Sequence, residues 1–210
     1  TITAVLDLEQ KLGQEIIWLR GMGWEEMLQR KKAIPNQQKR FCTTVMKIIP
    51  IFEFCYFRLG KVMMRMGYRY DEIERYYNAT KTMKYPVRSE YQPNSDRWIQ
   101  RWETIEWRDL EFPLIEDKVS HYHIKEYWKN QSIDFPLDSN CQNCFWKHEQ
   151  QLRKNYETNP DIMRWAAIHE DIMGYTFRDK YSLLQIEKMG IQQDFMFGVG
   201  AGCQAGFCTD

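Results

Sequence analysis

Apolar positions recur with a helical period along several stretches of the chain. Over residues 3–12 they stand three and four positions apart, and Gly13 is suited to end that helix because glycine tolerates the left-handed conformation of a C-cap. Pro50 is tolerated in a first turn, so a helix is predicted over 50–59. Similar patterns predict helices over 24–31, 121–128, 144–156, 162–173 and 181–188. Much of the second half of the chain is therefore expected to be helical.

Short runs of β-favouring residues lie between the helices of the first half. The pattern predicts a strand over residues 15–19 and a buried strand over residues 61–66. A third predicted strand ends within residues 110–115. Alternation of helices and strands is typical of an α/β fold with a parallel sheet. The polar residues 78–97 include two prolines and predict a long surface loop, of the kind that often forms a functional lid.

The same pattern divides the chain into two regions. Residues 1–115 are predicted to form an α/β domain, and residues 116–210 a mainly helical region. Within the second region, residues 131–140 are a predicted loop. The glycine-rich stretch from residue 195 to the end shows no periodicity and is expected to be mobile.

Composition and charge narrow the possible functions. Hydrophobic residues make up 43% of the 210 residues, which is enough for a sizeable core. Lys and Arg number 29 and so do Asp and Glu, so no global field draws the chain to nucleic acid or to an anionic membrane. No apolar run approaches the roughly 18 to 20 residues that cross a bilayer. We expect a cytoplasmic protein, in which cysteines serve more often as ligands or reactive thiols than as disulfides.

The densest group of candidate functional residues lies just before the helix that begins with proline. Residues 40–50 read R-x-C-T-x-x-x-K-x-x-P, which places the cations Arg40 and Lys47 near the thiol of Cys42 and the hydroxyl of Thr43. Guanidinium and ammonium groups are strong donors to phosphate and sulfate oxygens. The spacing indicates an anion-binding site or, as the alternative, surface ion pairs of little energetic weight.

A second group of cations follows the strand predicted at 61–66. Residues 67–75 read G-x-R-x-D-E-x-x-R, and Gly67 permits a bend that turns Arg69 and Arg75 to one side. These guanidiniums are suited to the same kind of anion as the first motif. The two acidic residues between them are alternative, purely structural partners.

Six cysteines are more than packing requires. Cys141 and Cys144 form a C-x-x-C motif at the start of a predicted helix, and Cys42, Cys203 and Cys208 supply further thiols. This spacing serves zinc, an iron–sulfur cluster or a dithiol redox pair, and packing is the remaining alternative. The sixth cysteine lies in the apolar helix over 50–59 and is a predicted core residue.

The two cationic motifs, in this order, resemble the family of phosphoadenosine-phosphosulfate (PAPS) reductases and related adenine-nucleotide alpha hydrolases. The resemblance extends through Phe112-Pro113-Leu114-Ile115 and Ile133-Asp134-Phe135-Pro136 to the C-x-x-C motif. It implies a parallel-sheet nucleotide alpha hydrolase (HUP-like) domain that binds ATP or a PAPS-like adenosine nucleotide. The residues that it assigns to the nucleotide are Arg40, Thr43, Lys47, Gly67, Arg69 and Arg75.

The resemblance also assigns roles to the thiols. In the iron–sulfur branch of the family, a double cysteine precedes the Lys…Pro segment, and a later C-x-x-C completes the cluster. Here Cys42 occupies the first of those two positions and Thr43 the second. The implied ligands of an iron–sulfur cluster or zinc are Cys42, Cys141, Cys144, Cys203 and Cys208.

Cluster-free reductases of the family carry a catalytic cysteine on a C-terminal tail. By this comparison the candidate catalytic thiols are Cys42, Cys203 and Cys208, although the Glu-Cys-Gly-Leu-His setting of the family is absent. A thiol becomes reactive when its pKa is lowered, and we expect Arg40 to lower the pKa of Cys42.

One defining feature of the family has no counterpart. The S-G-G-K-[DS]-S loop, whose backbone binds nucleotide phosphates, does not occur in the sequence. The family nevertheless implies an enzyme of adenosine-nucleotide-dependent sulfur chemistry, either sulfonucleotide reduction or sulfur transfer. The alternative is a non-catalytic subunit of a nucleic-acid-modifying or phage-defence complex, in which protein partners contact the nucleic acid.

Overall fold

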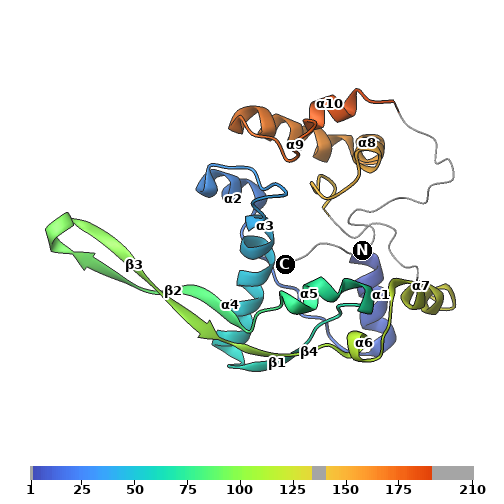
Figure 1. Cartoon of the computed structure of the whole chain (residues 1–210), viewed down its shortest axis with the longest axis horizontal. Helices are drawn as coiled ribbons and strands as arrows, with labels where there is room; N and C mark the ends of the chain where they lie inside the picture. The colour runs from blue at the N-terminus through green and yellow to red at the C-terminus, as the bar shows by residue number, and fades with distance from the viewer. Residues whose placement is uncertain (1, 134–140, 191–210) are drawn as a thin grey trace. The chain divides into compact units, whose positions relative to one another are not determined.

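The computed structural model describes residues 2–133 and 141–190, which form two compact units (Figure 1). Unit 1 combines the residues up to 47 with those from 121 onward, and unit 2 is the intervening segment 48–120. The boundary predicted at residue 115 lies close to the second point at which the chain passes between the units. No helix among the described residues is long and apolar enough to cross a membrane.

Unit 2 is built on a short parallel sheet. Strand β1 (Val62–Arg65) pairs in parallel with β4 (Arg108–Glu111). Helix α4 (Ile49–Arg58) precedes β1, and the short helices α5 (Ile73–Tyr77) and α6 (Pro113–Glu116) follow β1 and β4 in the chain. A mixed α/β fold with a small parallel sheet and many helices is therefore confirmed.

The core of unit 2 forms where α4 meets the sheet. Phe52, Cys55 and Trp107 are buried together, and the rings of Phe52 and Trp107 meet edge to face with centroids 5.5 Å apart. The prediction that Cys55 is a core residue is confirmed. The strand predicted at 61–66 is confirmed as β1, but its burial alternates from residue to residue, because only one face of the strand packs on the core.

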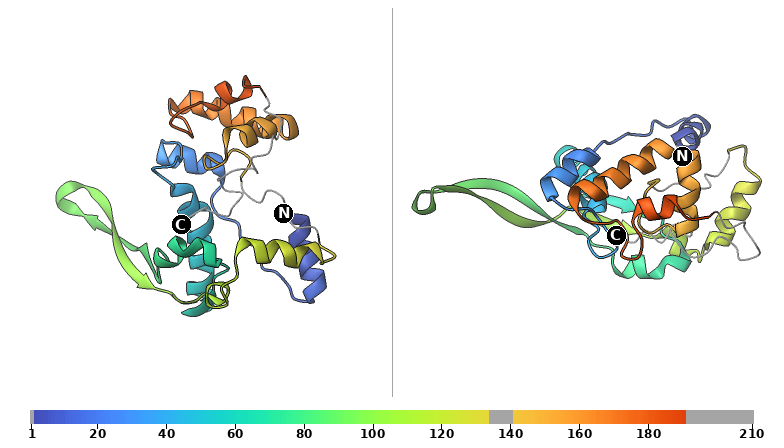
Figure 2. Two further views of the ribbon diagram at one scale, coloured as in Figure 1. Left: turned by 45° about the vertical axis from the view of Figure 1, so that its right-hand side comes forward. Right: turned by 90° about the horizontal axis from the view of Figure 1, so that it is seen from above.

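A long β-hairpin stands where a surface loop was predicted. Strands β2 (Thr82–Gln92) and β3 (Arg97–Glu106) are antiparallel, with an irregular register between Pro86 and Arg88 (Figure 2). At the tip, Asp96 adopts a left-handed conformation with φ 46°. The loop prediction was wrong because it took Pro86 and Pro93 as loop markers, whereas Pro86 stands at the irregularity in register and Pro93 at the tip between the strands.

Unit 1 is helical in its described part. Its elements are α1 (Ile2–Leu12), α2 (Trp24–Lys31), α3 (Phe41–Thr43), the π-helical turn η1 (Thr44–Ile48, which ends one residue inside unit 2), α7 (His121–Lys129), α8 (Glu149–Thr158), α9 (Pro160–Met173) and α10 (Leu183–Glu187). The buried cluster joins Met27 and Leu28 of α2 to Leu152, Met163 and Leu183 of the last three helices. The helices predicted over 3–12, 24–31, 121–128, 162–173 and 181–188 are confirmed, with ends that differ by a few residues.

Two predictions for unit 1 were wrong. Residues 15–19 form no strand, because a strand needs a hydrogen-bonded neighbour and none lies beside this segment in the described residues. The helix predicted from residue 144 begins only at Glu149. The segment before it forms turns instead, and those turns carry the C-x-x-C motif.

Candidate functional site

The first cationic motif runs through a change of helical geometry. Helix α3 passes into the π-helical turn η1, which leads directly into α4. Pro50 has no backbone N–H to complete an α-helical turn here, and π-turns of this kind are frequent at functional sites. Lys47 lies in this turn with an exposed side chain, and it forms no ion pair with any described residue. Its ammonium group is therefore available to an anion.

Cys42 lies close to the C-x-x-C motif, although the two are far apart in the sequence. The thiol of Cys141 acts electrostatically on Cys42, and both act on Cys144. Cys42 also packs against the buried cluster that contains Phe145. The fold of unit 1 thus places the three described thiols near enough to act on one another electrostatically.

The C-x-x-C motif lies on two successive turns, residues 141–147, which we call the thiol turn. The backbone N–H of Cys144 donates to the carbonyl of Cys141 at 3.1 Å, and that of Lys147 donates to the carbonyl of Cys144 at 3.0 Å. The next residue, His148, ends the turn as the N-cap of α8, and its Nδ1 accepts from the backbone of Gln150. This cap occupies one of the two ring nitrogens of His148.

Two polar side chains, the buried Asn155 and the partly buried Arg178, hold the thiol turn in place. Asn155 of α8 donates to the carbonyl of Gln142 at 2.7 Å. Arg178 donates to the carbonyls of Phe145, at 2.9 Å, and Lys147. Because these carbonyls are satisfied by side chains from other segments, the turn is stable without continuing as a helix.

Arg178 also joins the thiol turn to the first residue of α8. Its guanidinium pairs with the carboxylate of Glu149 at 2.6 Å, and both side chains are mostly buried. Sequence reasoning found neither Asn155 nor Arg178, since nothing in their local sequence relates them to the cysteines. They are positioning residues for the thiols.

The thiols are harder to ionise than was expected. Burial raises the pKa of Cys42 and the neighbouring Cys141 raises it further, whereas Thr43 and Arg40 lower it by less. Burial likewise raises the pKa of Cys144, against the opposing effects of the Trp146 backbone and Lys147. The expectation that Arg40 would leave Cys42 with a lowered pKa was therefore wrong, because desolvation outweighs the guanidinium.

Cations nevertheless lie beside the thiols. The guanidinium of Arg40 lies over the ring of Trp146, 5.7 Å from its centroid. The side chain of Lys147 is fully buried and acts electrostatically on Cys144. A buried ammonium group is costly unless other groups compensate it, and it favours a negative charge on a neighbouring group.

The described thiols do not close into a metal site. Within residues 2–133 and 141–190, no three His, Cys, Asp or Glu side chains are grouped so that they could hold a metal ion. The other two predicted ligands, Cys203 and Cys208, lie outside the described residues, as does their predicted catalytic role. Beside the thiols, the side-chain nitrogens of Asn143 and Trp146 are buried donors with no hydrogen-bond partner in the described structure.

The second cationic motif belongs to unit 2 and is internally neutralised. Glu72 is buried, and its carboxylate pairs with Arg69 at 3.4 Å and with Arg75 at 2.9 Å. Asp71 pairs with Arg69 at 3.2 Å. The two acids thus balance the two guanidiniums, which agrees with the structural role considered for them. The geometry shows no excess positive charge here, and anion binding by Gly67, Arg69 and Arg75 stays a prediction.

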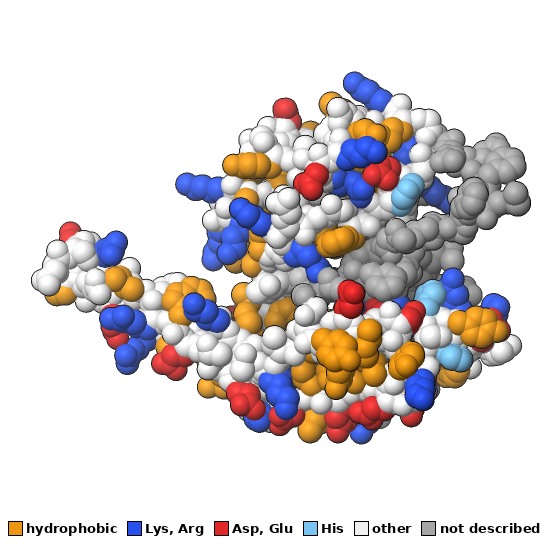
Figure 3. Space-filling model, in the orientation of Figure 1, with side chains coloured by type: hydrophobic (Ala, Val, Ile, Leu, Met, Phe, Trp, Pro, Cys, Tyr) orange, Lys and Arg blue, Asp and Glu red, His pale blue; other side chains and the backbone are white. Residues whose placement is uncertain are grey.

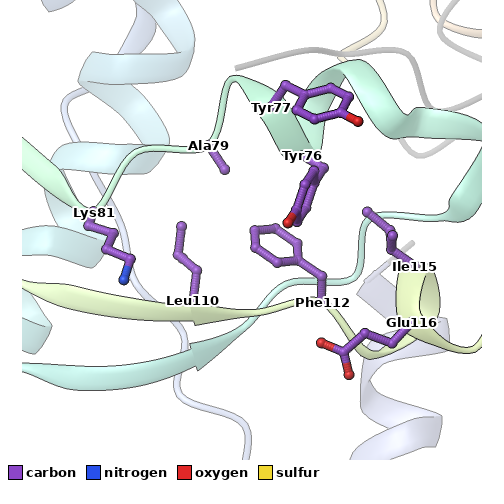
Figure 4. A pocket seen from close by; sticks show the side chains of 8 residues that line it. All are labelled: Tyr76, Tyr77, Ala79, Lys81, Leu110, Phe112, Ile115 and Glu116. Carbon is purple, nitrogen blue, oxygen red and sulfur yellow. The ribbon is translucent and has the colours of Figure 1, made fainter.

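A cavity of about 470 Å³ opens beside this motif in unit 2 (Figure 4). It lies where β4 ends, and parallel α/β sheets commonly bind ligands at the carboxyl ends of their strands. The ring centroids of Tyr76 and Phe112 are 4.7 Å apart in an edge-to-face contact. Lys81 and Glu116 lie at opposite ends of the cavity. Its lining residues are Tyr76, Tyr77, Ala79, Lys81, Leu110, Phe112, Ile115 and Glu116. The sequence analysis did not identify this cavity.

Comparison with known proteins finds no relative for this chain: no family model, no curated protein and no solved structure matches it.

Proposed function

We propose that the chain acts on an adenosine nucleotide in sulfur chemistry, in the manner of the PAPS reductase-like enzymes that its motifs resemble. The observation that carries the proposal is the grouping of Cys42, Cys141 and Cys144 in unit 1, with Arg40 and Lys147 beside them. Thiols beside cations are suited to sulfur-containing oxyanions, because the cations offset the charge that such a ligand brings.

The raised pKa of Cys42 and Cys144 argues against either thiol acting as a free nucleophile, so metal ligation is proposed as their role. A raised pKa means that each thiol keeps its proton more readily than an ordinary cysteine does. A zinc ion or an iron–sulfur cluster would displace those protons, since metals bind the thiolate form. Cys203 and Cys208 complete the ligand set in this proposal. A cluster would supply electrons for reduction, whereas zinc would stabilise the thiol turn.

Nucleotide binding has two separate candidate sites, one within each unit. Lys47, with Arg40 and Thr43, offers donors to phosphate or sulfate oxygens. The other candidate is the cavity of unit 2, which Tyr76 and Phe112 line with aromatic surface for a base and where Lys81 lies at one end for an anionic group. A nucleotide alpha hydrolase (HUP-like) domain is the fold that this function implies.

The first experiment is the iron, acid-labile sulfide and zinc content of anaerobically purified protein. We expect bound metal that is lost in Cys144→Ser and retained in Cys55→Ser, because Cys55 lies in the core of unit 2. Iron with matching sulfide would identify a cluster, and zinc alone a stabilising site. Protein without either metal, or a Cys144→Ser variant that keeps its metal, would overturn the assignment of the ligands.

The second experiment measures binding of ATP and PAPS by titration calorimetry. Lys47→Ala should weaken binding by about 1–3 kcal/mol, the usual range for a hydrogen bond to a charged group, without a change in melting temperature. Lys31→Ala, an exposed lysine of α2 in the same unit, is the matched control. If neither nucleotide binds the protein, the nucleotide part of the proposal is wrong.

A further inference from the structure

The outer part of the β2–β3 hairpin has no core of its own. At its base, Met83, Tyr85 and Ile105 pack against the buried cluster of unit 2. Beyond them, residues 86–102 extend away from the rest of the unit as a two-stranded ribbon, which we call the hairpin arm (Figures 1 and 2). Isolated two-stranded hairpins are marginally stable in water, so an exposed arm of this length suggests that it serves binding.

One face of the hairpin arm carries large aromatic rings. Alternation along β3 puts Trp98 and Trp102 on the same face, and the register adds Tyr91 opposite Trp98. Their exposed fractions are 70%, 51% and 47%. The rings of Tyr91 and Trp98 are tilted against each other with centroids 5.5 Å apart. Exposed rings in such a group are unusual on a surface that meets only water.

The opposite face of the hairpin arm is cationic. It carries Arg88, Arg97 and Arg101, and the carboxylate of Glu90 lies between two of them, 2.9 Å from Arg88 and 2.6 Å from Arg101. One carboxylate therefore serves two guanidiniums, and Arg97 forms no ion pair with any described residue. Figure 3 shows basic and hydrophobic side chains interspersed along the arm. The other acid of the arm, Asp96, accepts a hydrogen bond from the hydroxyl of Tyr91.

We propose that the hairpin arm binds single-stranded nucleic acid along the outer edge of β3, with bases stacked on Trp98 and Trp102 on one face and phosphates held by Arg97 and Arg101, which reach the same edge from the other face. Aromatic rings beside cations are the recurring means of holding single strands without sequence readout. The ring faces need unpaired bases, since those of a duplex are already stacked.

The composition of the aromatic face favours this ligand over a protein partner. The polar pair Ser89 and Gln100 separates the Tyr91–Trp98 pair from Trp102, and no aliphatic side chain fills the interval. A docked helix or a second copy of the chain would instead need a continuous apolar surface. Stacking tolerates the gap, because each ring binds one base independently.

Fluorescence anisotropy of labelled oligothymidylate and oligouridylate, titrated with the full chain at low salt, tests the proposal. Trp98→Ala should weaken binding about 5- to 150-fold, which corresponds to the usual energy of one stacked base, and Trp98→Phe should restore much of it. Gln100→Ala, on the same face between the rings, is the matched control and should bind as the wild type does. Arg97→Gln leaves every ring in place and should reduce the dependence of affinity on salt.

Several outcomes would overturn the proposal. One is the absence of binding to either oligonucleotide, and another is unchanged affinity in both Trp98→Ala and Arg97→Gln. Tighter binding to a duplex of the same length would point to groove contacts instead of stacking. If light scattering shows a dimer that Trp98→Ala converts to a monomer, and the wild type binds no oligonucleotide, the arm is an interface between copies. Each result is independent of metal content and of ATP binding.

Discussion

The thiol turn of unit 1 and the hairpin arm of unit 2 satisfy their backbone hydrogen bonds in opposite ways. The thiol turn is held by Asn155 and Arg178, whose side chains reach its carbonyls from other segments. The hairpin arm satisfies its backbone through its own strand pairing and leaves its side chains to solvent. The conformation of the thiol turn therefore depends on tertiary contacts, whereas that of the hairpin arm depends on the pairing of its own two strands.

We therefore expect the effect of a substitution on the free energy of unfolding to depend on where the residue lies more than on its type. Substitutions that remove a buried ring or a buried donor should be costly, and those on the arm should cost little while they affect binding. The free energy of unfolding, measured by urea denaturation, separates the two cases.

The largest effect is expected at the base of the arm. Trp107 is 1% exposed and precedes β4, so Trp107→Ala should lower the free energy of unfolding by about 3–5 kcal/mol through the cavity it leaves. A cost below about 1 kcal/mol would show that the cluster around Phe52 is not the core of unit 2.

Arg178→Ala should be the most damaging change at the thiol turn. It removes the donors to the carbonyls of Phe145 and Lys147 and the partner of Glu149, for a cost of about 2–4 kcal/mol. Arg164→Ala, which breaks an exposed pair with Glu187, is the control and should cost below about 1 kcal/mol. Equal costs for the two variants would contradict the role of Arg178 in holding the thiol turn.

Asn155→Ala should cost about 1–3 kcal/mol, because the carbonyl of Gln142 loses its buried donor. It should also loosen the turn without removing a thiol. Alkylation followed by mass spectrometry should show exposed Cys141 labelled first in the wild type, and Cys144 labelled faster in the variant than in the wild type. Unchanged labelling of Cys144 would mean that Asn155 does not position it.

A smaller effect is expected from acid. Burial tends to raise the pKa of Glu149, but hydrogen bonds from its own backbone and the charge of Arg178 outweigh burial and hold that pKa below the usual value of 4.5. A lowered folded-state pKa stabilises the protein above the unfolded value, and this stabilisation is lost as pH falls through the folded value. The difference in unfolding free energy between wild type and Glu149→Gln should therefore shrink below about pH 4.5. A difference that grows as pH falls would contradict the assignment.

The smallest effect is expected on the arm itself. Trp98→Ala should change the free energy of unfolding by no more than about 0.5 kcal/mol, because its ring covers no buried surface apart from Tyr91. The difference in unfolding cost between Trp98→Ala and Trp107→Ala would then be due to the burial of Trp107 alone. A cost above about 2 kcal/mol would show that the ring packs against something in the folded protein.

Local patterns predicted most elements with a buried face. The helix over 24–31 and the helix that begins near Pro50 were predicted from periodicity and caps, and the structure has both as α2 and α4. The hairpin arm was missed because Pro86 and Pro93 in a polar segment favoured a loop, whereas Pro86 stands at an irregularity in register and Pro93 at the tip. The helix predicted from residue 144 was placed too early, because donors from Asn155 and Arg178 favour turns there.

The sequence by itself determined the chemistry available to this protein: which thiols and cations it carries, and where apolar faces make helices. Those properties follow from residue type and spacing within a few turns of chain. Only the tertiary structure decided that Cys42 joins Cys141 and Cys144, and that Glu72 neutralises its neighbouring arginines. It also decided that Trp98 faces solvent while Trp107 is buried. Burial and charge pairing depend on segments far apart in the chain, and those are related only once the chain has folded.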